Sequence, residues 1–231
     1  MIEEILNKAI ELRNEDFKIT ETNNLSEVNN LSDEMSAIVC SATVFFINLK
    51  NMPYIIKNDG KRAASKTYKI FHEALSVFAK ETNAYLIDHN SNSFLLVYAS
   101  SIKEIDTHIE NAYRLSYVLG KELVKSIPQF NSLNFAIGID HGRVLGTKSN
   151  QGILWYGTCI DKAAAISELC LKPSYLGISG LIYSEISENL KTITRHILGI
   201  PKKEPAWVKG SYQFENERKH YYSSNHTIEV K

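Results

Sequence analysis

The chain has 231 residues, a length that fits one large domain or one domain with a small extension. Hydrophobic residues make up 44 % and charged residues 23 %, the ordinary balance of a globular protein. Lys and Arg together number 26, as do Asp and Glu, so the net charge is zero. Because a general nucleic-acid-binding protein normally carries a basic excess, we expect no nucleic-acid partner.

The three cysteines, Cys40, Cys159 and Cys170, are far apart and odd in number, so the sequence predicts neither a disulfide framework nor a zinc site. We expect reduced thiols in a cytosolic protein. No apolar run approaches the roughly 18 residues needed to cross a bilayer, so no membrane association is expected. The acidic, helical start at Met1 does not resemble a signal peptide, which favours a cytoplasmic location.

The N-terminal segment is predicted to be separate from the main domain. Residues 2–13 place apolar side chains at mostly helical spacing, and residues 20–36 are rich in Asn, Ser and Thr, which predicts an irregular connector. We therefore divide the chain into a helical leader and connector at 1–38 and a domain at 39–231.

Strand and helix patterns alternate through the domain. Short β-branched and aromatic runs predict strands, and apolar stripes at helical spacing predict helices. The predicted strands are 42–48, 84–87, 94–99, 135–139, 152–155 and 175–178. The predicted helices are 63–82, 104–125, 160–170 and 180–190. The polar linker 88–93 predicts a hairpin. The order β-α-β-β-α-β up to residue 139 predicts a ferredoxin-like α+β fold, with two helices covering one face of an antiparallel sheet.

Four segments, in order along the chain, resemble motifs of the class III nucleotidyl cyclases, the adenylate and guanylate cyclase catalytic domains. They are residues 44–51 (VFFINLKN), similar to the family's first strand; 92–98 (NSFLLVY), similar to its GD hairpin; 136–145 (AIGIDHGRVL), similar to its GIxxGxV strand; and 154–167 (LWYGTCIDKAAAIS), similar to its WxGxxVNxAxRL turn and helix. The resemblance covers residues 17 to about 225.

The two ends of this region resemble stand-alone bacterial cyclases. The leader 17–22 and the tail 206–225 are similar to these enzymes, among which are the Pycsar-type pyrimidine cyclases of antiphage defence. The resemblance implies a cyclase fold, a head-to-tail dimer, and a role in bacterial cyclic-nucleotide signalling or antiphage defence.

The resemblance also implies a metal site that this chain has lost. Class III cyclases hold two metal ions with two aspartates, and the metals activate the 3′-hydroxyl for attack on the α-phosphorus. The corresponding positions here are Asn48 and Asn92. An amide oxygen carries no negative charge, so most of the Coulomb attraction for a divalent ion is lost. No metal and no cofactor are therefore expected.

Two further positions of the family's site come from the partner subunit. An Asn orients the ribose, and an Arg or Lys four residues later stabilises the transition-state phosphate. Asp161 and Ala165 occupy these positions here. A carboxylate repels a triphosphate, a methyl group donates no hydrogen bond, and the loss of one such donor costs roughly 10²–10³ in rate.

The nucleotide-binding positions also differ from the family pattern. Asp88 stands where adenylyl cyclases have a base-reading Lys, and Leu154 stands where they have a polar base reader. Asp88 is interpreted as a turn carboxylate, with a displaced metal ligand as the alternative. Lys50, Asn51 and Met52 stand where backbone amides of the family hold phosphate; a phosphate site and an ordinary loop are both open for this segment.

Three hypotheses follow. The first is a catalytically inactive cyclase homologue that acts as a nucleotide-binding, regulatory or dimerisation module. The second is an active cyclase with unusual or partner-supplied ligands for Mg²⁺ or Mn²⁺. The third is a fold-level false match to another ferredoxin-like interaction domain. The expected partner is a second copy, or a cyclase paralogue in a heterodimer.

Overall fold

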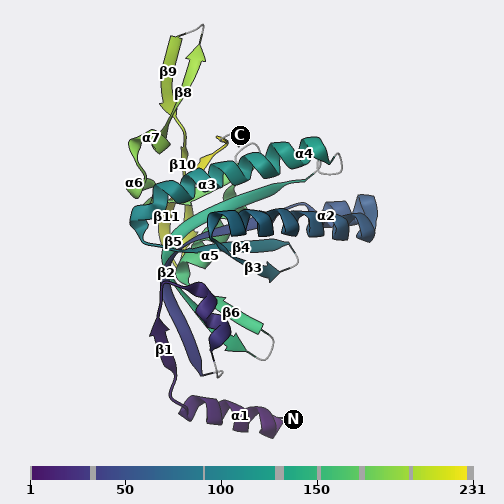
Figure 1. Cartoon of the computed structure of the whole chain (residues 1–231), viewed down its shortest axis with the longest axis vertical. Coiled ribbons are helices and arrows are strands. Elements are labelled where there is room, and N and C mark those ends of the chain that lie inside the picture. Colours follow the sequence, from purple (N-terminus) through teal and green to yellow (C-terminus); the bar gives the residue numbers. More distant parts are fainter. Residues whose placement is uncertain are drawn as a thin grey trace.

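The computed structural model describes residues 2–31, 35–90, 92–127, 133–149, 152–171, 175–197 and 200–227. It confirms an α+β architecture with a mostly antiparallel sheet and helices packed on it (Figure 1). No helix in these ranges is long and apolar enough to span a membrane.

The sheet is built around two long central strands. Its strands are β1 (Lys18–Glu21), β2 (Ser36–Leu49), β3 (Tyr85–Asn90), β4 (Ser93–Ala99), β5 (Phe135–Ser149), β6 (Gly152–Tyr156), β7 (Leu176–Ser179), β10 (Val208–Phe214) and β11 (Glu217–Ser224). They pair in the order β10-β11-β7-β5-β2-β4-β3. Strand β1 runs parallel to the first part of β2, and β6 folds back on the last part of β5. Strands β8 (Thr192–Ile197) and β9 (Ile200–Pro205) form a separate hairpin that projects from the body (Figure 1).

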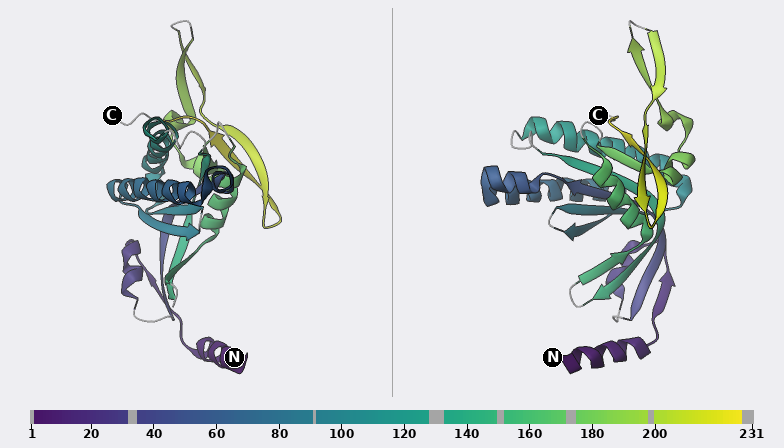
Figure 2. Two further views of the ribbon diagram at one scale, coloured as in Figure 1. Left: turned by 90° about the vertical axis from the view of Figure 1, so that its right-hand side faces the viewer. Right: turned by 180° about the vertical axis from the view of Figure 1, so that it is seen from behind.

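Helices cover both faces of the sheet. They are α1 (Ile2–Asn14), α2 (Met52–Thr82), α3 (Ile105–Tyr117), α4 (Leu123–Ser126), α5 (Thr158–Leu169), α6 (Gly180–Glu185) and α7 (Glu188–Lys191), with 3₁₀ turns at Leu25–Asn30 and Ile102–Glu104 and a π-helical turn at Val118–Glu122. Figure 2 shows α2 and α3 on one face and α5 on the other. Helix α1 stands off the body at the opposite end from the β8–β9 hairpin.

Several predicted boundaries are corrected by the structure. The helix predicted at 63–82 begins at Met52, and Gly60, with a φ of 85°, bends it. The helix predicted at 180–190 is broken after Glu185. Strand β3 continues to Asn90, so Asp88 lies in a strand and not in the turn. The predicted connector at 20–36 contains the end of β1 and a 3₁₀ turn.

The core has two layers because successive residues of β2 point to opposite faces. Phe45, Ile47 and Leu49 pack with α2 and α3, whereas Val44 and Phe46 pack on the α5 side. All of them are buried. The three cysteines are also buried and free, and burial raises the pKa of Cys40 to about 11.

Helix α5 lies directly on the backbone of β5 and β7. A Cβ atom at Gly138 would overlap the Ala163 carbonyl oxygen and lie 2.6 Å from the Ser167 amide nitrogen. A Cβ at Gly177 would lie 2.5 Å from Cys170 Sγ. Glycine is therefore required at these positions by the close approach of the helix.

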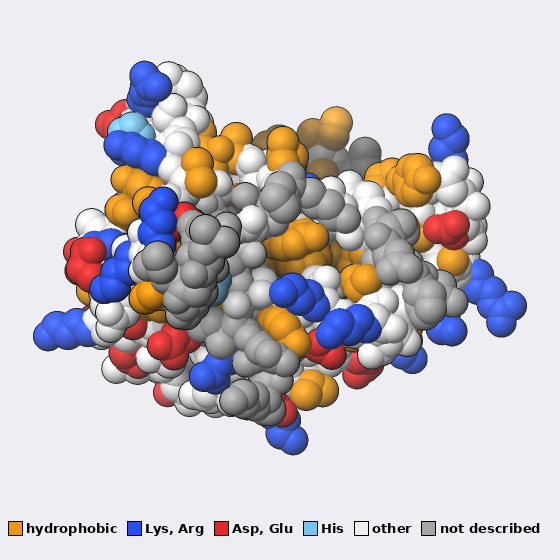
Figure 3. All heavy atoms as spheres, turned by 90° about the horizontal axis from the view of Figure 1, so that it is seen from above, with side chains coloured by type: hydrophobic (Ala, Val, Ile, Leu, Met, Phe, Trp, Pro, Cys, Tyr) orange, Lys and Arg blue, Asp and Glu red, His pale blue; other side chains and the backbone are white. Residues whose placement is uncertain are grey.

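The face seen from above in Figure 3 carries Lys and Arg side chains scattered among acidic and hydrophobic ones. Because the three kinds of side chain are interspersed, the described residues form no continuous basic patch on this face, of the kind that a nucleic-acid backbone would need.

We predict that Gly138→Ala destabilises the protein severely, because the added methyl group meets helix backbone that cannot rotate away. The expected loss is about 3 kcal/mol or more in the free energy of unfolding, measured by urea denaturation. Gly120→Ala is the matched control, since a Cβ there would lie 3.6 Å from the Phe135 ring, an ordinary contact. Equal stabilities of the two variants would contradict the close seating of α5.

A second prediction concerns acid stability. His108 is 7 % exposed, and burial lowers its pKa from 6.5 to about 4. Between pH 6.5 and about 4, His108 therefore takes up a proton in the unfolded chain but not in the folded chain. Stability should be complete above pH 6.5 and fall by on the order of 3 kcal/mol as the pH drops to about 4.

His108→Phe removes the titrating imidazole, so it should flatten the profile of unfolding free energy against pH between pH 6.5 and about 4, measured by urea titrations at successive pH values. The phenyl ring should preserve the packing against Tyr98, whose ring centroid lies 4.5 Å from that of His108. His220→Phe, at an exposed position, is the control and should leave the profile unchanged. An unchanged slope in His108→Phe would rule out His108 as its source.

Candidate functional site

The two asparagines at the predicted metal positions lie close together: Asn48 is near the end of β2, and Asn92 is in the turn that leads into β4. Asn48 pairs with Ser93 on β4. The next residue of β2, Leu49, donates its amide to the Asn92 carbonyl oxygen at 2.8 Å. The polar turn between two apolar strands predicted the β3–β4 hairpin, and the pairing of β4 with β2 places the turn residue Asn92 next to Asn48.

The last turn of α5 closes over Asn48. The Asn48 side chain is 4 % exposed, and its amide nitrogen Nδ2 donates a hydrogen bond to the Glu168 carboxylate. Among the described residues, no group donates to Asn48 Oδ1. A carboxylate from the same chain thus lies beside the position at which the resemblance predicts the family's first aspartate.

Lys50 is held by the same helix end. Its ammonium group Nζ donates to the carbonyl oxygens of Glu168 at 2.8 Å and Cys170 at 2.6 Å. These carbonyls end α5, where the helix dipole attracts a cation. Burial lowers the pKa of Lys50, and the Glu168 charge opposes that shift. Lys50 therefore stabilises the C-terminus of α5.

Asn51 and Met52 begin α2 beside these groups. The Asn51 side-chain oxygen Oδ1 accepts from the Asn134 amide at 2.7 Å, which ties the start of α2 to the segment before β5. Met52 is buried in the core between the sheet and the helices. The first turn of α2 contains Pro53, so one of its four free amide positions has no N–H to offer.

Asp88 contacts helix α2 and not the two asparagines. Its carboxylate lies 3.4 Å from His72 Nε2 on α2. It pairs with Phe94 across the β3–β4 hairpin. The structure gives Asp88 a surface ion-pair partner in place of the hairpin-capping role that the sequence predicted.

Three site positions lie apart from this group. Leu154 is on β6, with its side chain 43 % exposed, and Asp161 and Ala165 are on the first two turns of α5. Asp161 is exposed and lies roughly 10 Å along the helix axis from Glu168. Within one chain the predicted residues thus form two separate groups, one around Asn48 and one around Asp161.

Trp155 belongs to the core of the α5 face. Its ring lies over Gly146 and 5.6 Å from the Tyr85 ring, between their centroids. It is part of the cluster that includes Val44 and Cys159.

The residues present do not fit the family's two-metal site. Within the described ranges no three His, Cys, Asp or Glu side chains are grouped so that they could hold a metal ion. The position of the first metal offers one amide oxygen and one carboxylate, from Asn48 and Glu168. The Asn92 backbone oxygen is already bonded to Leu49. This donor set does not support a catalytic step through a pair of metal ions.

Asp140 is a buried carboxylate outside both groups. It is 2 % exposed, and burial raises its pKa, opposed by a hydrogen bond from Ser179, the backbone amide of His141 and the charge of Lys162. It points to the α5 side, whereas His141 faces Thr43. The adjacent pair therefore cannot act together, as the alternation of a strand predicts.

Glu168 is the site residue that sequence reasoning missed. It lies in the last turn of α5, one residue beyond the segment that resembles the cyclase motif, and its partner Asn48 is 120 residues away. A helical wheel places residues 161, 165 and 168 on one stripe, which is the signal that could have found it.

Solved structures with a similar fold are cyclase domains. The guanylyl cyclase Cya2 superposes with a TM-score of 0.65 at 10 % identity, covering 83 % of this chain and 94 % of its own. The adenylyl cyclase CyaB from P. aeruginosa gives 0.62 at 10 % identity, covering 84 % and 97 %. A class III adenylyl cyclase-like ATP-binding protein from Pseudomonas aeruginosa gives 0.62 at 13 % identity, covering 76 % and 41 %.

No family model matches the chain. No curated protein matches it either. At identities of 10–13 % the likeness to the solved structures is one of fold, and it spans most of the chain. The chain therefore has the fold of a class III nucleotide cyclase catalytic domain.

Proposed function

We propose that the protein is a catalytically inactive cyclase homologue, a binding and dimerisation module that uses the cyclase fold without its chemistry. One observation carries this proposal. The groups at the end of β2 that would meet metal and phosphate, Asn48 and Lys50, are already bonded to the last turn of α5 in the same chain. The leader proposed at residues 1–38 would be attached to this module through β1 and the first residues of β2, which pair within the sheet.

Electrostatics supports the same conclusion. A triphosphate approaching Asn48 meets the Glu168 carboxylate, and Lys50 cannot turn to it without leaving two carbonyl oxygens unpaired. If two chains combine their two groups, the partner adds Asp161, a further negative charge, and Ala165, which donates nothing. A nucleotide-binding role is supported by the Pseudomonas aeruginosa protein of this fold, which is named as a cyclase-like ATP-binding protein.

A second candidate function is an active cyclase with a relocated carboxylate. The observation that favours it is the position of Glu168, which brings a negative charge to the place of the missing aspartate at Asn48. The neighbours named as guanylyl and adenylyl cyclases support it as well. Glu168 separates the two candidates, because removal of its carboxylate would abolish the activity of a cyclase that relies on it and would leave an inactive homologue inactive.

We predict that purified protein incubated with ATP, GTP, CTP or UTP and Mg²⁺ or Mn²⁺ yields no cyclic mononucleotide above background in chromatography with mass detection. The physical reason is the missing charge at two metal positions and the missing cation at Ala165. Product that disappears in Glu168→Gln, and persists in the exposed control Glu185→Gln, would establish the second candidate instead.

A rescue series tests the reason for inactivity. Asn48→Asp alone would place the new carboxylate beside that of Glu168. Because two like charges repel at this distance, one of the two carboxylates would take up a proton. Metal binding should therefore need Asn48→Asp and Asn92→Asp together with Glu168→Ser. Turnover should need Asp161→Asn and Ala165→Arg as well, because these groups act as a unit. Metal binding by the Asn48→Asp and Asn92→Asp pair without the Glu168 change would show that Glu168 does not block the site.

We also propose that the chain forms a two-fold pair with a second copy. The support is the separation of the Asn48 and Asp161 groups within one chain, together with exposed apolar side chains beside the second group. Leu154 and Tyr156 on β6 are 43 % and 51 % exposed. A cyclase paralogue is the alternative partner, and it would use the same surface.

Light scattering of the purified chain should give the mass of a dimer, and Leu154→Glu combined with Tyr156→Glu should shift it to the monomer by placing charge in the interface. Val77→Glu, at a position 59 % exposed on α2, is the matched control and should remain dimeric. A monomer at high concentration would contradict self-association and leave only the paralogue.

A further inference from the structure

A chain of hydrogen-bonded side chains crosses the other face of the sheet, away from the asparagines. Ser41 Oγ lies 3.1 Å from His141 Nε2, and His141 Nδ1 lies 3.0 Å from Thr43 Oγ1. Thr43 Oγ1 lies 3.4 Å from Ser100 Oγ, which donates to the Tyr98 carbonyl oxygen at 3.2 Å. Strands β2, β5 and β4 meet here, because Thr43 pairs with both His141 and Tyr98.

The end of this chain fixes the direction of every proton in it. A carbonyl oxygen only accepts, so Ser100 donates to Tyr98 and accepts from Thr43. Thr43 has then used its proton, so it accepts from His141 Nδ1–H. The neutral His141 ring therefore has its lone pair on Nε2, facing the Ser41 hydroxyl.

Burial keeps this imidazole neutral. Thr43 is fully buried, and the pKa of His141 is lowered by its burial. His108 on α3 is close enough to interact electrostatically with His141. Ser41, by contrast, is exposed. An exposed hydroxyl bonded to a half-buried, oriented base is the arrangement that activates a serine nucleophile.

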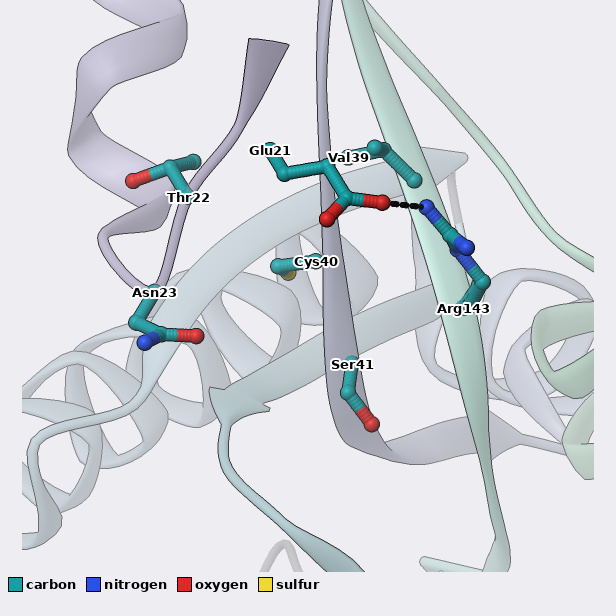
Figure 4. A pocket seen from close by; sticks show the side chains of 7 residues that line it. All are labelled: Glu21, Thr22, Asn23, Val39, Cys40, Ser41 and Arg143. Atoms are coloured by element: carbon teal, nitrogen blue, oxygen red, sulfur yellow. Dashed lines mark hydrogen bonds and ion pairs between the residues drawn. The ribbon is translucent and has the colours of Figure 1, made fainter.

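Ser41 opens into a pocket of about 500 Å³ (Figure 4). Thr22 and Asn23 line one side of it, and an ion pair between Glu21 and Arg143 lies at the other end from Ser41. The opposite charges of this pair compensate each other. The pocket therefore suits a small uncharged substrate better than an anion.

The backbone of Ser41 also offers a donor group beside the hydroxyl. The Ser41 carbonyl oxygen accepts from the amide of Ser100, the residue after the end of β4, at 3.1 Å, on the same side of β2 as β1 and β4. Because the N–H and C=O of one residue in an antiparallel ladder point to the same side, the Ser41 N–H also points there. A backbone N–H beside the nucleophile is a donor for a developing oxyanion.

We propose that Ser41 and His141 form a second site that hydrolyses small uncharged carboxylic esters. Ser41 Oγ bonds to the acyl carbon, its proton passes to His141 Nε2, and the carbon–oxygen bond to the alcohol breaks as the alcohol takes that proton. Water then attacks the acyl-serine, loses its proton to His141, and releases the acid, with the proton returned to Ser41. Thr43 is a positioning residue that holds the His141 tautomer.

The test uses the full chain with a fluorophosphonate probe and with 4-nitrophenyl acetate. Peptide mapping by mass spectrometry should find the adduct on Ser41, and ester hydrolysis should fall to background in Ser41→Ala. His141→Gln should slow labelling by roughly 10²–10⁴, because glutamine cannot take the proton. Absence of an adduct on Ser41 in the unmodified protein would overturn the proposal without any variant.

Variants at Thr43 distinguish tautomer control from packing. Thr43→Val keeps the shape and removes the acceptor of Nδ1–H, so labelling should slow by about tenfold or more. Thr43→Ser keeps the hydroxyl and should label at the normal rate. Ser211→Ala, at an exposed serine on β10, is the control and should label normally. Equal rates for Thr43→Val and Thr43→Ser, or an unchanged rate in His141→Gln, would disprove the relay.

Discussion

Helix α5 can lie on the backbone of the sheet only because Gly138 and Gly177 carry no side chains. A methyl group at Gly138 would occupy the space of the Ala163 carbonyl oxygen. A layer packed on a sheet usually lies about 10 Å from it, because side chains fill the space between the two layers. At Gly138 and Gly177 no side chain stands between α5 and the sheet backbone. The glycines therefore fix how deep α5 lies, and with it the position of everything the helix carries.

The contacts between the end of β2 and the end of α5 follow from this close packing. With α5 lowered onto β5, its C-terminal turn reaches β2, where Lys50 binds the last carbonyl oxygens and Asn48 donates to Glu168. A lysine on free helix carbonyls stabilises both the cation and the helix end. An aspartate at position 48 would have met Glu168 as a like charge. The asparagine is thus a residue that this packing tolerates, so the packing of α5 alone gives a reason for an uncharged side chain at position 48.

The sequence predicted the strands and helices that carry strong periodic patterns, and it predicted the hairpin that brings Asn92 to Asn48. It missed the last four strands, because residues 192–224 mix Lys, Glu and aromatic residues on a half-exposed surface, where burial supplies little alternation. It placed Asp88 in a turn because its polar neighbours resemble one, while pairing with Phe94 extends the strand. Thr43 was beyond reach, since its role depends on a contact with His141, 98 residues away. Glu168 left one signal in the sequence, its place on a helical stripe with residues 161 and 165, but its partner Asn48 lies 120 residues away.

Strand β2 supplies both sites, and its alternation keeps them independent. Asn48 is an even-numbered position that faces α5, whereas Ser41 and Thr43 are odd-numbered positions that face the opposite side. About seven residues of extended chain separate the two ends, roughly 23 Å. Groups this far apart without a shared partner contribute additively to stability and function. The proposed absence of cyclase chemistry at one end of β2 therefore places no constraint on the proposed serine site at the other end.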